Sequence, residues 1–280
     1  MNSKDLGPLS HTEAAIGVFD SGLGGLTVLK ELKLRLPQER YIYLGDTART
    51  PYGSKGRETI IRFARECSEF LFDWGIKMLV VACNTASSYA IEALRAESPI
   101  PILGTIDAAA RQALQVTRTG KIGVIGTDAT IASRAFEKAL QRDGFKHALH
   151  SKACPLFVPL VEQGMCEGEI VEKIVELYLS DFRRADLDTL ILGCTHYPLL
   201  KNVIQEFLGA EVRIVECSAA LAEEAGSLLP EYVLSKTSPL KKDRLFITDD
   251  TPKFESMAAF ILGSSKLSVE RAMLGEGARP

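Results

Sequence analysis

Long apolar runs are missing from this sequence of 280 residues. The longest, from Ile76 to Cys83, contains Lys77 and is far short of the roughly 20 residues that a membrane-spanning helix needs. The N-terminal segment MNSKDLGPLSHTEAA also lacks the apolar core of a secretion signal. We therefore expect a cytoplasmic protein with no membrane partner, in which residues 1–13 form a disordered arm.

An excess of positive charge is also missing. The chain has 33 basic and 36 acidic side chains, a net charge of −3, so no basic footprint points to nucleic acid. None of its six cysteines forms a C-x-x-C pair, and no histidine lies at zinc-ligand spacing from a cysteine pair. We predict no metal site, and free thiols in a reducing compartment.

Short apolar runs alternate with helical patterns along the chain. The runs that predict strands are 15–20, 41–46, 78–83, 101–106, 121–127, 156–161, 189–194, 212–217 and 245–250. Apolar residues at helical spacing predict helices at 26–37, 58–75, 132–144 and 169–184. Continuous apolar runs are typical of strands buried on both faces, so the alternation predicts an α/β protein with largely parallel sheets.

Two pairs of segments resemble each other in the same order and at a similar offset. IGVFDS at 16–21 resembles IGVIGT at 122–127, and VVACNTAS at 80–87 resembles LILGCTHY at 190–197. Chance similarity between apolar strands is the alternative, but polar residues follow the strand in every case. We therefore predict two related α/β halves.

Four of the predicted strands end in small polar residues. These ends are Asp20-Ser21, Cys83-Asn84-Thr85, Gly126-Thr127 and Cys194-Thr195-His196. Ligands of open α/β sheets bind beyond the carboxyl ends of the strands. If the two halves face each other, these ends converge on one cleft.

Cys83 and Cys194 each lie between an apolar strand and a helical pattern. A strand-end cysteine can be a small buried apolar residue, but the matching context of the pair favours function. Helix N-termini stabilise a thiolate and can lower its pKa, so we expect activated thiols at both positions.

Other polar residues near these ends allow two readings. Asp20 is either a turn residue or a carboxylate that orients substrate or tunes a thiol. His196, beside Cys194, is either a core residue or, as we favour, a proton handler or hydrogen-bond partner. Glu162, after the predicted strand at 156–161, reads from the residues alone as a solvated loop charge. The glycines of 22–25 resemble a phosphate cradle but lack a complete nucleotide-binding motif.

These motifs contain no Lys or Arg that could clamp a carboxylate. Their neutral donors, together with backbone N–H groups at helix starts, suit a small zwitterionic or anionic ligand. The donor side chains are Ser21, Ser54, Asn84, Thr85, Thr127 and Thr195.

Four motifs closely resemble the glutamate racemase family. They are FDSGLGGLTVLKEL (19–32), GDTARTPYGSKG (45–56), VACNTASSYA (81–90) and ILGCTHYPLL (191–200), and the resemblance extends over about residues 14–262. It implies a cofactor-independent enzyme, usually a homodimer, that supplies D-glutamate for peptidoglycan and thereby for cell-wall biogenesis and cell shape. It also implies an active site between two pseudosymmetric domains, 14–107 plus 218–280 and 108–217.

The resemblance also implies the roles of the site residues. Cys83 would act on one enantiomer, assisted by Asp20, and Cys194 on the other, assisted by Glu162 and His196. The residues that would hold substrate are Ser21, Pro51, Tyr52, Gly53, Ser54, Asn84, Thr85, Thr127 and Thr195. One departure is VECSAALAEEA, in which Cys217 stands where an Asp-Ser or Asn-Ser turn is expected.

Three other functions stay open. A racemase for another acidic amino acid, such as aspartate, would differ in pocket depth. A cysteine hydrolase would use Cys194 with His196 as base and would not require Cys83. A non-catalytic amino-acid-binding protein needs no paired thiols. Dependence on pyridoxal phosphate is disfavoured because no motif for it was found.

Overall fold

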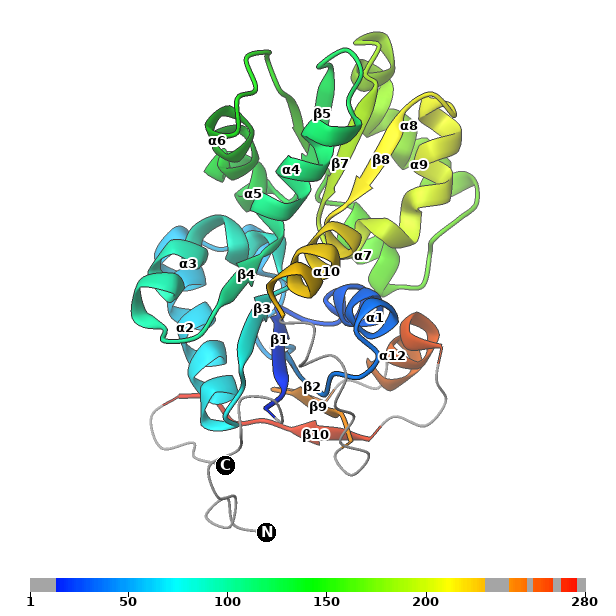
Figure 1. Cartoon of the computed structure of the whole chain (residues 1–280). Helices are drawn as coiled ribbons and strands as arrows, with labels where there is room; N and C mark the ends of the chain where they lie inside the picture. The colour runs from blue at the N-terminus through cyan, green and yellow to red at the C-terminus, as the bar shows by residue number, and fades with distance from the viewer. Residues whose placement is uncertain (1–13, 230–241, 251–253, 264–267, 276–280) are drawn as a thin grey trace.

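The chain folds into two parallel sheets with helices on their faces, one sheet in each half of the molecule (Figure 1). The computed structural model describes residues 14–229, 242–250, 254–263 and 268–275, so the arm expected at 1–13 lies outside the described residues. The predicted α/β class with two mostly parallel sheets flanked by helices is confirmed.

The first sheet has six strands in the order β10-β9-β2-β1-β3-β4, and all neighbours are parallel. The strands are β1 (Ile16–Asp20), β2 (Tyr41–Gly45), β3 (Met78–Val81), β4 (Ile102–Gly104), β9 (Arg244–Ile247) and β10 (Val269–Arg271). Every residue of β1 and β3 is buried, which explains why both read as unbroken apolar runs. After building the second sheet, the chain returns to place β9 beside β2.

The second sheet has four parallel strands in the order β6-β5-β7-β8. They are β5 (Ile122–Gly126), β6 (His150–Ala153), β7 (Thr189–Gly193) and β8 (Arg213–Glu216). β7 pairs with β5 in the same way that β3 pairs with β1. Cys83 and Cys194 therefore follow strands that hold equivalent places in the two sheets.

Helices cover both sheets and fill the space between them. They are α1 (Leu26–Arg35), α2 (Arg57–Asp73), α3 (Asn84–Glu97), α4 (Thr105–Val116), α5 (Asp128–Ser133), α6 (Ala135–Arg142), α7 (Phe157–Glu162), α8 (Glu169–Arg184), α9 (Lys201–Leu208), α10 (Cys217–Leu228) and α12 (Phe254–Leu262), with the 3-10 helices η2 (Tyr52–Ser54) and η3 (Tyr197–Leu200). Among the helices that the structure describes, none combines the length and apolar character needed to cross a membrane.

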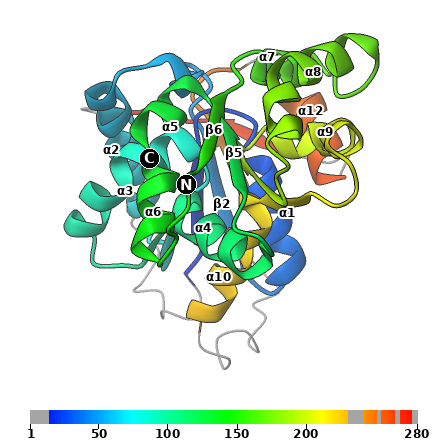
Figure 2. The same cartoon turned by 90° about the horizontal axis from the view of Figure 1, so that it is seen from above.

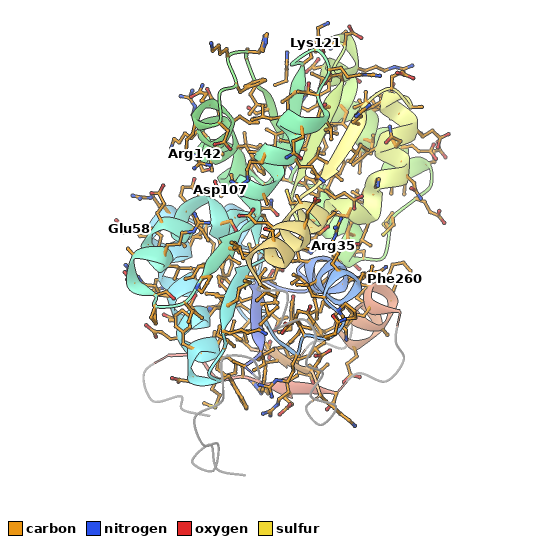
Figure 3. The ribbon with its side chains drawn as sticks, viewed as in Figure 1. Arg35, Glu58, Asp107, Lys121, Arg142 and Phe260 are labelled. Carbon is orange, nitrogen blue, oxygen red and sulfur yellow. The ribbon has the colours of Figure 1, made fainter. Side chains whose placement is uncertain are left out.

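The two halves meet along α4 and α10. α10 packs against both α4 and α1, which is visible in Figures 1 and 2. Asp107 of α4 accepts hydrogen bonds from Arg95 of α3 at 3.1 Å and from Arg142 of α6 at 3.0 Å. Figure 3 shows Asp107 and Arg142 at this junction. One carboxylate thus joins helices that flank different sheets.

The strand predicted at 156–161 is wrong, because this segment forms the helix α7. A short apolar run does not distinguish a strand from a buried helical turn. Phe157 and Val161, four residues apart, point to the core, and Pro159 lies in the first turn, where a helix tolerates proline. Glu162 is therefore the last residue of a helix and does not follow a strand.

Two further expectations need correction. The helix predicted at 132–144 is divided into α5 and α6 by Arg134, whose φ of 55° is left-handed.

The strands β6 and β10 were not predicted from the sequence. β6 is made of HSKA and is partly exposed at the edge of its sheet, so it has no apolar run.

Asp188 anchors the start of β7, the strand that ends at the second cysteine. Its carboxylate accepts hydrogen bonds from Thr117 Oγ1 at 2.7 Å, Arg118 N at 2.8 Å and Thr119 Oγ1 at 2.8 Å. Burial raises the pKa of Asp188, but hydrogen bonds from the Thr117, Thr119 and Thr189 side chains outweigh it and hold the pKa below its usual range. The ionised carboxylate thus ties the turn before β5 to β7.

We expect Asp188→Asn to lower the free energy of unfolding by about 2–4 kcal/mol, because hydrogen bonds to a charged acceptor are lost. The carboxylate has a lower pKa folded than unfolded. Its contribution is therefore present above about pH 4 and is lost as the pH falls through the folded pKa. The deficit should be large at neutral pH and shrink in acid, as measured by urea unfolding.

Asp186→Asn is the matched control. The Asp186 side chain is exposed and pairs with Lys121 at the surface, so the change should cost less than about 0.5 kcal/mol. Equal losses in the two variants would contradict the anchoring role of Asp188.

Candidate active site

One pocket lies where the carboxyl ends of β1, β3, β5 and β7 approach each other. Its empty space is about 320 Å³, including the part open to solvent. The lining residues are Ser21, Thr50, Pro51, Tyr52, Gly53, Cys83, Asn84, Thr85, Thr127, Val158, Cys194, Thr195 and His196. Both sheets contribute to it, so the polar strand ends of the two halves come together.

Most of the residues predicted for the site line this pocket. The exceptions are Asp20, which lies beneath it, Glu162, which reaches it through His196, and Ser54, which is exposed beside it. Thr50 and Val158 line the pocket without having been predicted. Thr50 precedes the Pro-Tyr-Gly-Ser run and could have been found from that motif, whereas Val158 belongs to the segment misread as a strand.

Cys83 caps the N-terminus of α3. Its Sγ accepts a hydrogen bond from Ala86 N at 3.5 Å and lies 3.6 Å from Ser21 Oγ. Burial raises the pKa of the thiol to about 12, helped by the charge of Asp20, although the hydrogen bond from Ala86 N and the contact with Ser21 Oγ act against it. The lowered pKa expected from the helix N-terminus is therefore wrong for Cys83, because desolvation of the thiolate outweighs the cap.

Cys194 has a different partner. His196 Nδ1 lies 3.8 Å from Cys194 Sγ, and His196 Nε2 lies 3.4 Å from Glu162 Oε1. Burial lowers the pKa of His196, but its contacts with Cys194 and Glu162 outweigh burial and raise the pKa to about 10. These contacts favour the protonated imidazole and place its Nδ1 beside the sulfur.

Asp20 is fully buried below the pocket. It accepts hydrogen bonds from Gly22 N at 3.0 Å and from Thr195 Oγ1 at 3.4 Å. Burial raises its pKa, while the charge of His196 and these hydrogen bonds lower it. Asp20 thus joins the turn after β1 to the turn after β7 and acts electrostatically on Cys83.

Gly24 permits close packing between the turn after β1 and the turn after β7. A Cβ on Gly24 would lie 2.4 Å from Thr195 Oγ1 and 2.6 Å from His196 Nδ1. Thr27 Oγ1 donates to Thr195 O across the same contact at 3.1 Å. Bringing two strand ends together explains Gly24 without a phosphate ligand.

Hydroxyl groups hold the other wall of the pocket. Thr85 Oγ1 lies 3.0 Å from Thr127 Oγ1 and 3.2 Å from Thr130 Oγ1, which links α3 to α5. The Tyr52 hydroxyl donates to the buried Asp46 and is therefore directed away from a ligand.

Among the described residues that line the pocket, none is Lys or Arg. Nor do the described His, Cys, Asp and Glu residues form a group that could hold a metal ion.

Two thiols and several neutral hydrogen-bond groups line one pocket, and the buried carboxylate of Asp20 lies close to it. Residues 25–225 match the model of the family described as Asp/Glu/Hydantoin racemase. The chain belongs to the Asp/Glu/hydantoin racemase family and is an isomerase.

Within that family its relatives are glutamate racemases. The chain is 51% identical to the glutamate racemase of Aquifex aeolicus over 89% of its own length and 94% of that protein. It superposes with a TM-score of 0.89 on glutamate racemase isoform RacE1 from Bacillus anthracis, 41% identical, covering 94% of this chain and 98% of that one. The Francisella tularensis glutamate racemase, solved in complex with D-glutamate, gives a TM-score of 0.87 at 37% identity, covering 94% and 98% of the two chains.

Gly24→Ala should lower racemase kcat by about 10- to 100-fold, because the new methyl group would displace Thr195 and His196. Initial rates and thermal unfolding would be measured together, so that a loss of fold is recognised. Gly56→Ala is the control, since nothing lies within 4 Å of a Cβ added there. Full activity in Gly24→Ala would show that this close contact is not needed.

Glu162→Gln should lower the pKa of His196, because it removes one of the groups that raise it. The wild-type pKa is above the unfolded value. Protonation therefore stabilises the fold fully below about pH 6.5, and this contribution is lost as the pH rises through about 10. NMR titration of the His196 ring measures the change.

Glu169→Gln is the control for this titration, since Glu169 is exposed and pairs with Lys173. A His196 pKa that stayed at its wild-type value in Glu162→Gln would refute the role of Glu162.

Proposed function

We propose that this chain is a glutamate racemase that interconverts L- and D-glutamate by proton transfer between two thiols at Cα. The observation that supports it is the presence of Cys83 and Cys194, which follow equivalent strands of different sheets, in the lining of one pocket. The relatives named above support glutamate as the substrate, because glutamate racemases match over nearly the whole chain.

Inversion of a stereocentre requires a base on one face and an acid on the other. In one direction the Cys83 thiolate takes the α-proton, and the electron pair of the Cα–H bond stays on the resulting carbanion. The Cys194 thiol then donates its proton from the opposite face and becomes the thiolate. In the reverse direction the two cysteines exchange roles, so no cofactor is needed for the proton balance.

Burial of Cys83 and Cys194 affects how each can act as acid or base. Because burial raises its pKa to about 12, Cys83 is a stable thiol at neutral pH, and its thiolate, once formed, is a strong base. Asp20 strengthens that base by raising its pKa. On the other side, the protonated His196, held by Glu162, would stabilise the Cys194 thiolate.

Neutral groups would hold the substrate. Asn84 Oδ1 is buried and has no hydrogen-bond partner among the described residues, which leaves it available to the substrate ammonium group. Hydroxyl and backbone donors of Ser21, Thr85, Thr127, Thr195 and the 51–54 run would bind the carboxylates. Carboxylate binding without a cation avoids leaving a charged side chain buried and unpaired in the empty site.

We further propose that the pocket opens and closes between two domains, residues 14–107 with 218–280 and residues 108–217. The turns that follow β1 and β7 belong to different domains in this division and meet at Gly24.

The family resemblance also supports a biological setting. In it, the enzyme is a homodimer in the cytoplasm and supplies D-glutamate for peptidoglycan.

Incubation with each glutamate enantiomer in D₂O tests the proposal. The wild-type protein should abolish optical rotation and place deuterium at Cα without added cofactor. Cys83→Ala and Cys194→Ala should each lower the rate by about 10²- to 10⁴-fold, the usual contribution of a positioned acid or base. Cys154→Ala is the control, because Cys154 is a buried thiol that does not line the pocket.

Three other outcomes would each contradict a different part of the proposal. Inertness toward both glutamate enantiomers would refute the substrate, and aspartate would be tested next. Inertness toward aspartate as well would favour a binding protein. Full racemisation by Cys83→Ala would refute the two-thiol mechanism and leave Cys194 with His196 as the functional pair.

A further inference from the structure

A third buried thiol, Cys217, contacts both halves of the site without lining the pocket. It is the first residue of α10 and is 3% exposed. Its Sγ lies 3.2 Å from Leu192 O in β7, two residues before Cys194. It also lies 3.2 Å from Asn84 Nδ2, next to Cys83. The proposed proton transfer does not use this thiol.

The hydrogen bonds of Cys217 determine which way the Asn84 amide faces. A thiol has a single proton, and here it is donated to the Leu192 carbonyl oxygen. The sulfur can therefore only accept from Asn84, so the NH₂ group of the amide must face it. The amide oxygen, Oδ1, is left without a partner among the described residues, on a side chain that lines the pocket.

The protonation state of Cys217 agrees with this arrangement. Burial raises the pKa of its thiol to about 12, although the hydrogen bond from Asn84 acts against it. The thiol therefore keeps its proton at neutral pH and continues to donate to Leu192. A rotated amide would turn Oδ1 toward the sulfur, which has no second proton to offer, and the NH₂ group toward the pocket.

We propose that Cys217 is a positioning residue that holds the Asn84 amide oxygen toward the substrate ammonium group. This inference rests on the proposed function. The thiol also connects Asn84 to β7, so the acceptor beside Cys83 is fixed relative to the strand that carries Cys194. A serine could make the same two hydrogen bonds, whereas an alanine could make neither.

Steady-state kinetics of Cys217→Ala and Cys217→Ser on both glutamate enantiomers test this role. In Cys217→Ala we expect KM to rise about three- to tenfold, the range for loss of one hydrogen bond, with a smaller change in kcat. Because the equilibrium constant between enantiomers is unity, kcat/KM must fall equally in both directions, which checks the data. Cys217→Ser should retain KM within about twofold of wild type. Cys154→Ala serves as the control for loss of a buried thiol.

A double variant separates positioning from a general loss of stability. If Cys217 acts through Asn84, then Cys217→Ala should not raise KM further in an Asn84→Ala background. An additive rise in KM, or failure of serine to restore KM, would overturn the inference.

The two proposals fail in different ways. Normal KM in Cys217→Ala, with active wild-type protein, would overturn this inference alone. A wild-type protein that neither racemises nor binds glutamate, with binding measured by calorimetry, would overturn the proposed function and this inference with it.

Discussion

Four buried titratable side chains lie close to one another where two parallel sheets present their carboxyl ends to each other. Asp20, Cys83, Cys194 and His196 are all buried there. Burial disfavours the charged form of each, so each needs a nearby partner to hold or release a proton. The pKa of Cys83 follows mainly from burial, and that of His196 from its contacts with Cys194 and Glu162. The protonation of these groups thus depends on how deeply the contact between the halves buries them.

Beside the pocket, small residues and backbone groups make part of that contact. Gly24 lets the turn after β1 touch the turn after β7, and Thr27 bonds to the backbone of Thr195. A larger side chain would separate the strand ends and admit water. The two thiols have different surroundings, although the strands that precede them hold equivalent places in the two sheets. Cys83 caps the N-terminus of α3 and is influenced by the charge of Asp20, whereas Cys194 lies 3.8 Å from His196 Nδ1.

Neutral hydrogen-bond groups form the walls of the pocket, and their orientation is set from behind. Tyr52 is held by Asp46, and the threonines of α3 and α5 bond to one another. Asn84 is held by Cys217, a residue that the sequence alone marked only as a departure from the family pattern. The described lining residues include no Lys or Arg, so the pocket carries no unpaired cation.

The sequence by itself determined the α/β class, most strands and helices, and most of the residues around the pocket. Unbroken apolar runs predict buried parallel strands, and the polar residues at their ends lie around one pocket. It misassigned α7, since a short apolar run fits either a strand or a helical turn, and it missed β6, whose residues HSKA carry no apolar pattern. Only the tertiary structure decided the pKa of Cys83, the Cys194–His196–Glu162 contact and the role of Cys217. Burial and long-range hydrogen bonds depend on which distant segments meet, and local sequence patterns carry no record of that.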